Sequence, residues 1–203
     1  DDMKYHTDAW YHVLNEDLHA GLSREQVKKE MYGKNGELLI RVFGENHFTP
    51  EEIDHWSGEK EKIYRRTFTP HLKLIEGLDS LLENAKQHRV KMAVGTAAIP
   101  ANVDLVLDGL HIRDYFDAII SAADVTVSKP DPTTFLKCAE RLQVAAKNCI
   151  VFEDAPKGVE AALNAGMKAV AITTMHTRGE FEGLPNILAF IKDYKDPWLT
   201  SLF

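Results

Sequence analysis

The sequence lacks several features that would place it in a specialised class of proteins. No apolar run approaches the about 18 residues that a membrane-spanning helix needs, and no secretory signal opens the chain. There are only two cysteines, Cys138 and Cys149, without metal-site spacing, so both are expected to be packing residues in a reducing compartment. We therefore expect a cytoplasmic protein without a membrane partner.

The sequence also lacks an excess of positive charge. Lys and Arg number 24 against 31 Asp and Glu, which gives a formal net charge of −7 over 203 residues. The electrostatic field of a negatively charged protein repels nucleic acid, and proteins that bind nucleic acid usually present a basic face. Hydrophobic residues make up 44% of the chain and charged residues 27%, the usual mixture of a globular protein with a core. The composition therefore argues against a nucleic-acid partner.

What is present falls into two regions, and the first has helical periodicity with no strand pattern. Ser23 opens a capping box, and Thr49 followed by Pro50 is typical of a helix N-cap. We predict four helices forming a small bundle over residues 1–70. A hinge to the remaining sequence is expected at 70–76.

In the second region, strand and helix patterns alternate. The predicted strands cover residues 91–95, 116–121, 148–152 and 168–172, and the predicted helices cover 77–88, 101–110, 132–142 and 157–165. Strands separated by helices of about ten residues are typical of parallel βαβ units with right-handed crossovers. The sequence therefore predicts an α/β domain with a parallel sheet.

The most informative stretch is an apolar run, residues 149–152, that ends in Glu153 and Asp154 and then opens a helix. Open α/β sheets bind ligands at the carboxyl ends of their strands, and Mg²⁺ prefers carboxylate oxygens. The alternative is that Asp154 only caps the following helix. A cap does not require the second acid, which favours a metal site.

Two further polar residues stand beside predicted secondary structure. Thr96 follows Gly95 at a strand end, where its hydroxyl could donate to a phosphoryl oxygen. Lys129 precedes two prolines that stiffen its loop, and an ammonium there could neutralise a phosphoryl group. A plain strand-to-helix turn and a solvated turn lysine are the ordinary alternatives, and neither motif decides the matter alone.

A hydroxyl residue ending one strand, a lysine before a helix and an acidic pair ending another strand occur here in that order. In this the chain resembles the haloacid dehalogenase superfamily of phosphatases and phosphomutases, specifically its β-phosphoglucomutase-like branch. Residues 152–167 are close to the family's form, and residues 5–10 look like the start of its cap. The resemblance implies a Rossmann-like parallel-sheet α/β core domain over residues 71–203 and a small all-helical cap domain over 1–70.

The resemblance also implies roles for individual residues. Thr96 and Ala97 would bind the transferring phosphoryl group, and Lys129 would balance its charge. Asp154, helped by Glu153, would hold Mg²⁺ as the cofactor. The partner would be a small phosphorylated metabolite such as a sugar phosphate, and we expect a monomer.

In the cap, His6 would lie near the catalytic acid, although a lone histidine on a helix is more often a surface residue. Lys34 and Arg41 would contact the substrate, and each is equally plausible as a solvated helix charge. Gly36 stands where related mutases have an arginine, and residues 98–100 stand where they have a Ser-Lys-Asn-like run. A phosphatase of small sugar or polyol phosphates is therefore favoured, with a β-phosphoglucomutase as the alternative.

The family's nucleophile is an aspartate on a first strand, with a general acid/base aspartate two residues later. The sequence has no Asp-x-Asp at a strand end, and Asp1-Asp2 has no strand before it. We expect that the chain as written lacks this strand, which would lie in the middle of the sheet. As written it should be inactive and possess unpaired strand edges. A non-catalytic protein that only binds phosphate or metal is a further alternative.

Overall fold

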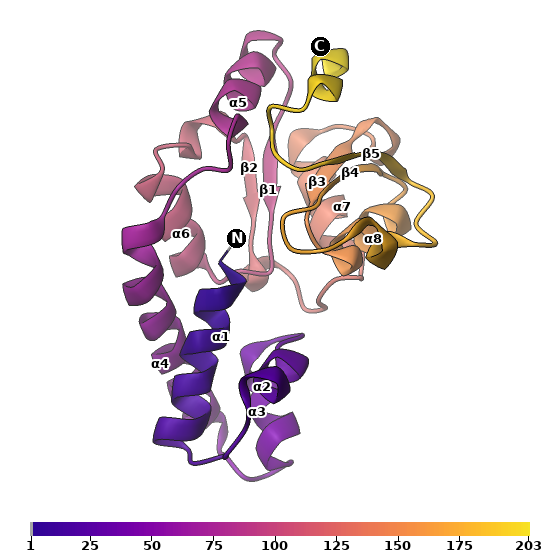
Figure 1. Ribbon diagram of the computed structural model, residues 1–203. Helices are drawn as coiled ribbons and strands as arrows, with labels where there is room; N and C mark the ends of the chain where they lie inside the picture. Colours follow the sequence, from indigo (N-terminus) through magenta and orange to yellow (C-terminus); the bar gives the residue numbers. More distant parts are fainter. Residues whose placement is uncertain (1) are drawn as a thin grey trace. The chain divides into compact units, whose positions relative to one another are not determined.

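The chain forms two compact units, Asp1–Leu72 and Lys73–Phe203, in a computed structural model that describes residues 2–203. The division lies two residues beyond the boundary predicted at residue 70. Among its described residues the first unit contains only helices and turns, whereas the second carries the parallel strands (Figure 1). Each unit has an apolar core of its own.

The described part of the first unit holds four α-helices, as predicted. They are α1 (Met3–His12), α2 (Arg24–Glu30), α3 (Asn35–Phe43) and α4 (Pro50–Phe68), with a π-helical turn (Val13–Asp17) after α1 and a 3-10 turn (Thr69–His71) after α4. The capping box predicted at Ser23 and the N-cap predicted at Thr49 are both present, and Thr49 also forms a capping box. A side chain that satisfies the first helical amides in this way stabilises a helix by about 1 kcal/mol.

The apolar faces of these helices close over one core. Trp10 and Val13 pack with Leu14, Val27 of α2 and Leu39 of α3, and none of these residues is more than 2% exposed. Burying a side chain of this size contributes about 1.5–3 kcal/mol. The helical spacing of apolar residues in the first region therefore determines which side of α1 turns inward.

The second unit alternates strands and helices in the predicted order. Its elements are α5 (Leu78–Gln87), β1 (Ala93–Gly95), α6 (Pro100–Gly109), β2 (Ala118–Ile120), α7 (Thr133–Leu142), β3 (Ile150–Glu153), α8 (Pro156–Asn164), β4 (Lys168–Ile172) and β5 (Ile187–Ile191). Short 3-10 turns lie at Arg113–Tyr115, Ala122–Asp124, Ala146–Asn148, Arg178–Phe181 and Pro197–Leu202. Strand β5 was not predicted. The prediction rested on strands separated by α-helices of about ten residues, and only a 3-10 turn separates β5 from β4.

All strand pairs are parallel, but among the described residues the sheet is divided into two parts. β1 pairs with β2, and β4 pairs with β3 on one side and β5 on the other. β1 and β3 are not hydrogen-bonded to each other. Because parallel strands end at one edge of a sheet, the last residues of β3 and β4 lie side by side, with Glu153 opposite Ala171.

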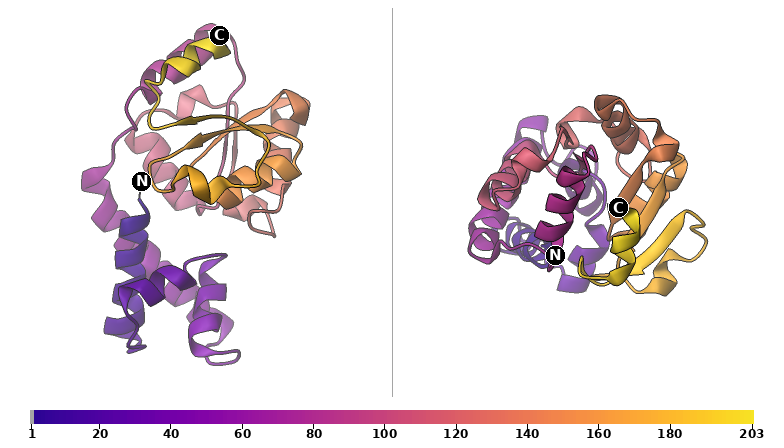
Figure 2. Two further views of the ribbon diagram at one scale, coloured as in Figure 1. Left: turned by 45° about the vertical axis from the view of Figure 1, so that its right-hand side comes forward. Right: turned by 90° about the horizontal axis from the view of Figure 1, so that it is seen from above.

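Helices α7 and α8 cover these strands. α8 packs on β3 and β4, as Figures 1 and 2 show. α7 packs on β1 and β2, while its Phe135 and Ala139 share an apolar cluster with Val151 of β3. Helix α7 therefore spans the neighbouring edges of the two sheet parts. Close contact with β1 requires Gly95, since a Cβ there would lie 3.0 Å from the Cys138 Sγ.

Candidate active site

Lys129 joins the ends of β1 and β3. Its Nζ donates to the backbone carbonyl of Gly95 at 3.3 Å and to the Oε1 of Glu153 at 2.5 Å. The ammonium also lies 4.5 Å from the centre of the Phe135 ring, a cation–π distance. The structure therefore brings together the three separated stretches that the sequence singled out.

The loop that carries Lys129 is held by local hydrogen bonds. Asp131 donates its N–H to the Ser128 carbonyl at 3.2 Å, and its Oδ1 accepts the N–H of Thr133, the first residue of α7, at 2.9 Å. The Asn164 side chain at the end of α8 donates to the carbonyl of Pro130 at 3.0 Å. The lysine thus extends from a loop that is fixed to helices α7 and α8.

Thr96 lies immediately after β1 in a serine/threonine turn. Its N–H donates to the Ile120 carbonyl at 2.9 Å, which extends the pairing with β2, and its Oγ1 accepts the N–H of Ala98 at 3.0 Å. A hydroxyl that accepts one bond keeps its proton for another acceptor. Thr96 is therefore able to donate to an oxygen at this strand end, next to the exposed residue Ala97.

The two acids at the end of β3 have different surroundings. Both oxygens of Glu153 are engaged: Oε1 by Lys129, and Oε2 by the N–H groups of Asp154 and Ala155 at 2.9 and 3.4 Å. The Glu153 side chain is only 11% exposed. Despite this burial, the Lys129 ammonium and these hydrogen bonds keep the pKa of Glu153 below its usual range. Glu153 therefore accepts hydrogen bonds from the Lys129 ammonium and from the backbone just before α8.

Asp154 is the second acid, and the carboxylate that pairs with Lys129 is that of Glu153. Burial, and then the charge of Glu153, raise the pKa of Asp154 to about 6. The helix-cap interpretation is not what the structure shows, since the N-cap of α8 is Ala155 and no side chain caps it. A nearby cation would favour the ionised carboxylate, so Asp154 fits a single hard ligand for Mg²⁺. Among residues 2–203 no three His, Cys, Asp or Glu side chains assemble into a metal group.

His6 belongs to a buried network inside the first unit rather than to an open surface. The Lys60 ammonium, 4% exposed, donates to His6 Nδ1 and to Glu61 Oε1, both at 2.8 Å. His6 stacks on Tyr64, whose hydroxyl donates to Asp2 at 2.6 Å. Burial and the Lys60 charge lower the pKa of His6 to about 4, so the imidazole is neutral at pH 7.

The two other candidates in the first unit differ in availability. Arg41 is committed locally: it donates to the Glu30 carboxylate at 3.1 Å and to the carbonyls of Glu30 and Tyr32, and its guanidinium covers the Tyr32 ring at 3.7 Å. Lys34 is exposed at the N-cap of α3, where its backbone N–H donates to Glu37. The local contacts of Arg41 describe a structural role.

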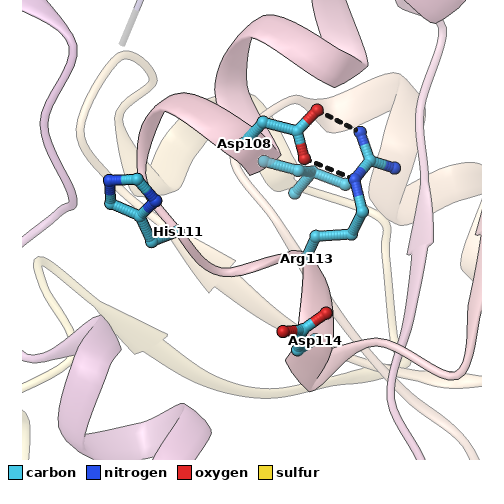
Figure 3. Close-up of a pocket in the computed structure, with 5 residues that line it drawn as sticks. Asp108, His111, Arg113 and Asp114 are labelled. Atoms are coloured by element: carbon cyan, nitrogen blue, oxygen red, sulfur yellow. Dashed lines mark hydrogen bonds and ion pairs between the residues drawn. The ribbon is translucent and has the colours of Figure 1, made fainter.

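Surface hollows lie elsewhere in the second unit. One of about 240 Å³ lies at the end of α6, where Arg113 pairs with Asp108 at 2.5 Å beside His111 (Figure 3). Asp104 also pairs with Arg113, at 2.6 Å, so the charges there neutralise one another. This end of α6 precedes β2 and faces the amino edge of the strands, away from Lys129. The hollow therefore takes no part in the candidate site.

Sequence reasoning missed several residues of these networks. Lys60 precedes Tyr64 by four residues and Phe68 by eight on α4, and a lysine within such an apolar stripe is a signal of a buried charge. Gly158 lies in the first turn of α8, an alanine-rich helix that glycine weakens. A glycine at such a position is a signal that another group packs closely against the helix. The ring of Phe135 beneath Lys129 has no sequence signal, because only the fold brings it there.

A parallel α/β unit whose strand ends hold a hydroxyl, an ammonium and an acidic pair, together with a helical unit, defines a class of phosphoryl-transfer enzymes. The sequence pattern described as "Haloacid dehalogenase-like hydrolase" matches residues 1–172. The chain belongs to this family, in its β-phosphoglucomutase-like branch, and is an enzyme of the phosphatase or phosphomutase kind. Within the described residues no helix is both long and apolar enough to cross a bilayer.

Individual relatives agree with this assignment. The chain is 31% identical over 186 residues to a β-phosphoglucomutase of Bacillus subtilis, which covers 85% of this chain and 77% of the relative. It is 48% identical over 84 residues to a fructose-1-phosphate phosphatase of Escherichia coli, covering 41% and 45%. The crystal structure of a β-phosphoglucomutase from Clostridium difficile superimposes with a TM-score of 0.82 and 25% identity, covering 100% of this chain and 89% of that one.

Proposed function

We propose that this protein is a Mg²⁺-dependent phosphoryl-transfer enzyme that hydrolyses small sugar or polyol phosphates. The observation that carries the proposal is the Lys129 ammonium, held between the Gly95 carbonyl and the Glu153 carboxylate beside Thr96. The fructose-1-phosphate phosphatase among its relatives supports a sugar phosphate as substrate. A monomeric state and a cytoplasmic location stay predictions.

Lys129 and Thr96 would bind the phosphoryl group. An ammonium has three N–H donors, and two of them are directed to Gly95 and Glu153. The third would donate to a phosphoryl oxygen, with the Thr96 hydroxyl proton as a second donor. Because Lys129 is only 16% exposed, its charge acts on the phosphoryl group with little screening by water.

Asp154 would hold Mg²⁺, while Glu153 keeps its bonds to Lys129 and the start of α8. When bound, the metal supplies positive charge that stabilises the oxygens of the transferring group. A shift of the Asp154 pKa back toward its ordinary range on adding Mg²⁺ would support this assignment. Asp154→Asn should remove Mg²⁺ binding measured by calorimetry, and unchanged affinity would refute the role.

Hydrolysis also needs an attacking carboxylate, which would become an aspartyl phosphate before water releases it. The sequence given contains no Asp-x-Asp at a strand end. β1 and β3 each have one edge that no other described strand pairs, and their carboxyl ends meet at Lys129. A parallel strand seated between them would carry an aspartate at its end to the lysine. Residues 1–203 alone are then expected to bind phosphate without turnover.

Phosphate release from a panel of sugar phosphates in the presence of Mg²⁺ tests the proposal. Four proteins are compared: residues 1–203, the same chain preceded by a strand segment bearing Asp-x-Asp, and that longer chain with Lys129→Met or with the exposed control Lys147→Met. Release is expected only from the longer chain and its Lys147 variant. No release by the longer chain from any substrate would reject the phosphatase.

A phosphomutase is the second candidate, because the B. subtilis and C. difficile relatives are β-phosphoglucomutases. A mutase must hold a second phosphate, and Arg41, a predicted contact, is occupied by Glu30 and backbone carbonyls. Lys34 remains as the exposed cation of that pair. Conversion of β-glucose 1-phosphate to glucose 6-phosphate without phosphate release would overturn the phosphatase in favour of the mutase.

A further inference from the structure

Gly158, in the first turn of α8, is in close contact with the side chain of Glu153. A Cβ at residue 158 would overlap the Oε1, Cδ and Cγ atoms of Glu153, at distances far shorter than any real contact. Gly158 itself is buried and has no left-handed backbone angle that would demand glycine. What requires glycine at this position is therefore the space that the Glu153 carboxylate fills.

The Glu153 side chain is not free to move aside. An overlap with the far end of a flexible side chain is normally relieved by a change of rotamer. Here Oε1 accepts from Lys129 at 2.5 Å, and Oε2 accepts from Asp154 N–H at 2.9 Å and from Ala155 N–H at 3.4 Å. Any movement of the carboxylate that makes room for a methyl group at 158 breaks this set of bonds.

Helix propensity alone would favour alanine over glycine at position 158. Glycine inside a helix is less favourable than alanine, and the same helix has alanine at positions 161 and 162. The chain thus has a residue that weakens α8 at the one place where its absent side chain makes room for the partner of Lys129. We propose that Gly158 is a positioning residue: it seats Glu153, which in turn orients the Lys129 ammonium toward the phosphoryl site. This inference rests on the phosphoryl-binding role of Lys129 proposed above.

A double-mutant cycle on the 203-residue chain tests whether Gly158 makes room for the Glu153 side chain. Gly158→Ala should lower the melting temperature when Glu153 is present. In a Glu153→Ala background the overlap is gone, and the same substitution should raise the melting temperature by about 2–4 °C through helix propensity. An increase in both backgrounds would overturn the proposal. If Glu153→Ala does not fold, Glu153→Ser provides the background.

A matched control is available in the first unit. Gly58 lies within α4 with an ordinary backbone angle, and a Cβ there would meet nothing within 4 Å. Gly58→Ala should therefore raise the melting temperature in the wild-type chain. A decrease for Gly158→Ala beside an increase for Gly58→Ala attributes the difference to the Glu153 contact and not to alanine as such.

Pulse acetylation with residue-resolved mass spectrometry tests the effect on the lysine, which a merely structural glycine would not change. Gly158→Ala should raise the reactivity of Lys129 several-fold, because the amine loses its carboxylate partner. The exposed Lys147 serves as the internal reference and should not change. A changed melting temperature with unchanged Lys129 reactivity would overturn the positioning role.

Binding of inorganic phosphate, measured by calorimetry, separates this inference from the proposed function. Compared with the wild-type chain, the Gly158→Ala variant should bind phosphate more weakly, and the Lys129→Met variant should not bind it. A wild-type chain that binds no phosphate would refute the function proposed for Lys129. The cycle and the acetylation would still decide whether Gly158 controls the Glu153–Lys129 contact.

Discussion

At the scale of single residues, the candidate site is a charge pair taken largely out of water. The side chains of Lys129 and Glu153 are 16% and 11% exposed and 2.5 Å apart. Buried pairs of this kind add little net stability, because desolvation offsets attraction, but removing one partner is costly. Such a pair is therefore better explained by the position it gives the ammonium than by the stability it contributes.

Replacing the lysine tests that interpretation directly. Lys129→Met should abolish binding of inorganic phosphate and cost about 1–3 kcal/mol of unfolding free energy, because Glu153 keeps only backbone donors. Calorimetry and urea unfolding measure the two effects. The exposed Lys147→Met should change neither. Phosphate affinity that survives in Lys129→Met would contradict the site.

The neutral His6 makes stability depend on pH. Its pKa falls from the usual 6.5 to about 4 in the folded chain, through burial and then Lys60, against the opposing charges of Asp2 and Glu61. Between these values the unfolded state binds a proton that the folded state does not. The His6 contribution to stability should therefore fall, by up to about 3 kcal/mol, as the pH is lowered from 6.5 to 4. Asp154, whose pKa is raised to about 6, acts in the opposite direction over the same range.

Urea unfolding of the wild type and of His6→Gln across this pH range provides the measurement. Because glutamine does not titrate while Asp154 titrates in both proteins, the stability of the wild type relative to His6→Gln should decrease as the pH falls from 6.5 to 4. An identical slope in both proteins would mean that another group titrates in place of His6.

At the scale of elements, α4 carries two kinds of ion pair on opposite sides. Glu61 and Lys60 are 7% and 4% exposed and form part of the buried network, whereas Glu59 pairs with Lys62, which is 66% exposed. Exposed helix pairs contribute about 0.3–0.5 kcal/mol. A buried charge without its partner costs about 3–5 kcal/mol.

The two glutamates therefore make a matched comparison on one helix. Glu61→Ala should lower the unfolding free energy by about 3 kcal/mol or more, because Lys60 keeps its charge in a buried place. Glu59→Ala should cost less than about 1 kcal/mol. Equal costs in urea unfolding would show that Lys60 is not charged or not buried.

The contact of β1 with α7 depends on the glycine that ends the strand. A Cβ at Gly95 would lie 3.0 Å from Cys138 Sγ and 3.2 Å from Phe135 and Thr134. Gly95→Ala should destabilise the chain by about 1–3 kcal/mol through overpacking. The penalty should shrink in a Cys138→Ala background, where the nearest atom is removed. An equal penalty in both backgrounds would place the strain elsewhere.

At the scale of the whole molecule, one helical unit and one α/β unit share the chain, and the sheet is in two parts among residues 2–203. Strand edges that present unpaired amides accept a further strand readily. A strand segment joined ahead of residue 1 should therefore slow hydrogen exchange of the β1 and β3 amides. Amides of β4, which is already paired on both sides, serve as the control. Unchanged exchange in β1 and β3 would mean that the segment does not pair there.

Much of this architecture could be predicted. The capping box at Ser23, the N-cap at Thr49 and the strand Lys168–Ile172 are present as expected, since caps and apolar runs are local signals. Thr96, Lys129 and Glu153 stand at strand or loop ends, where parallel strands bring polar residues to one edge. Strand β5 could not be predicted, because strand pairing is made by residues far apart in the chain.

The sequence by itself determined the helical and α/β regions, and it also determined which residue types stand at the strand ends. Only the tertiary structure decided how those residues divide their work. It paired Glu153 with Lys129 and the start of α8, raised the pKa of Asp154 by burial, and placed His6 and Lys60 in one buried network. The reason is physical: a carboxylate or imidazole acquires its role from the donors, charges and burial around it, and these come from segments that meet only when the chain folds.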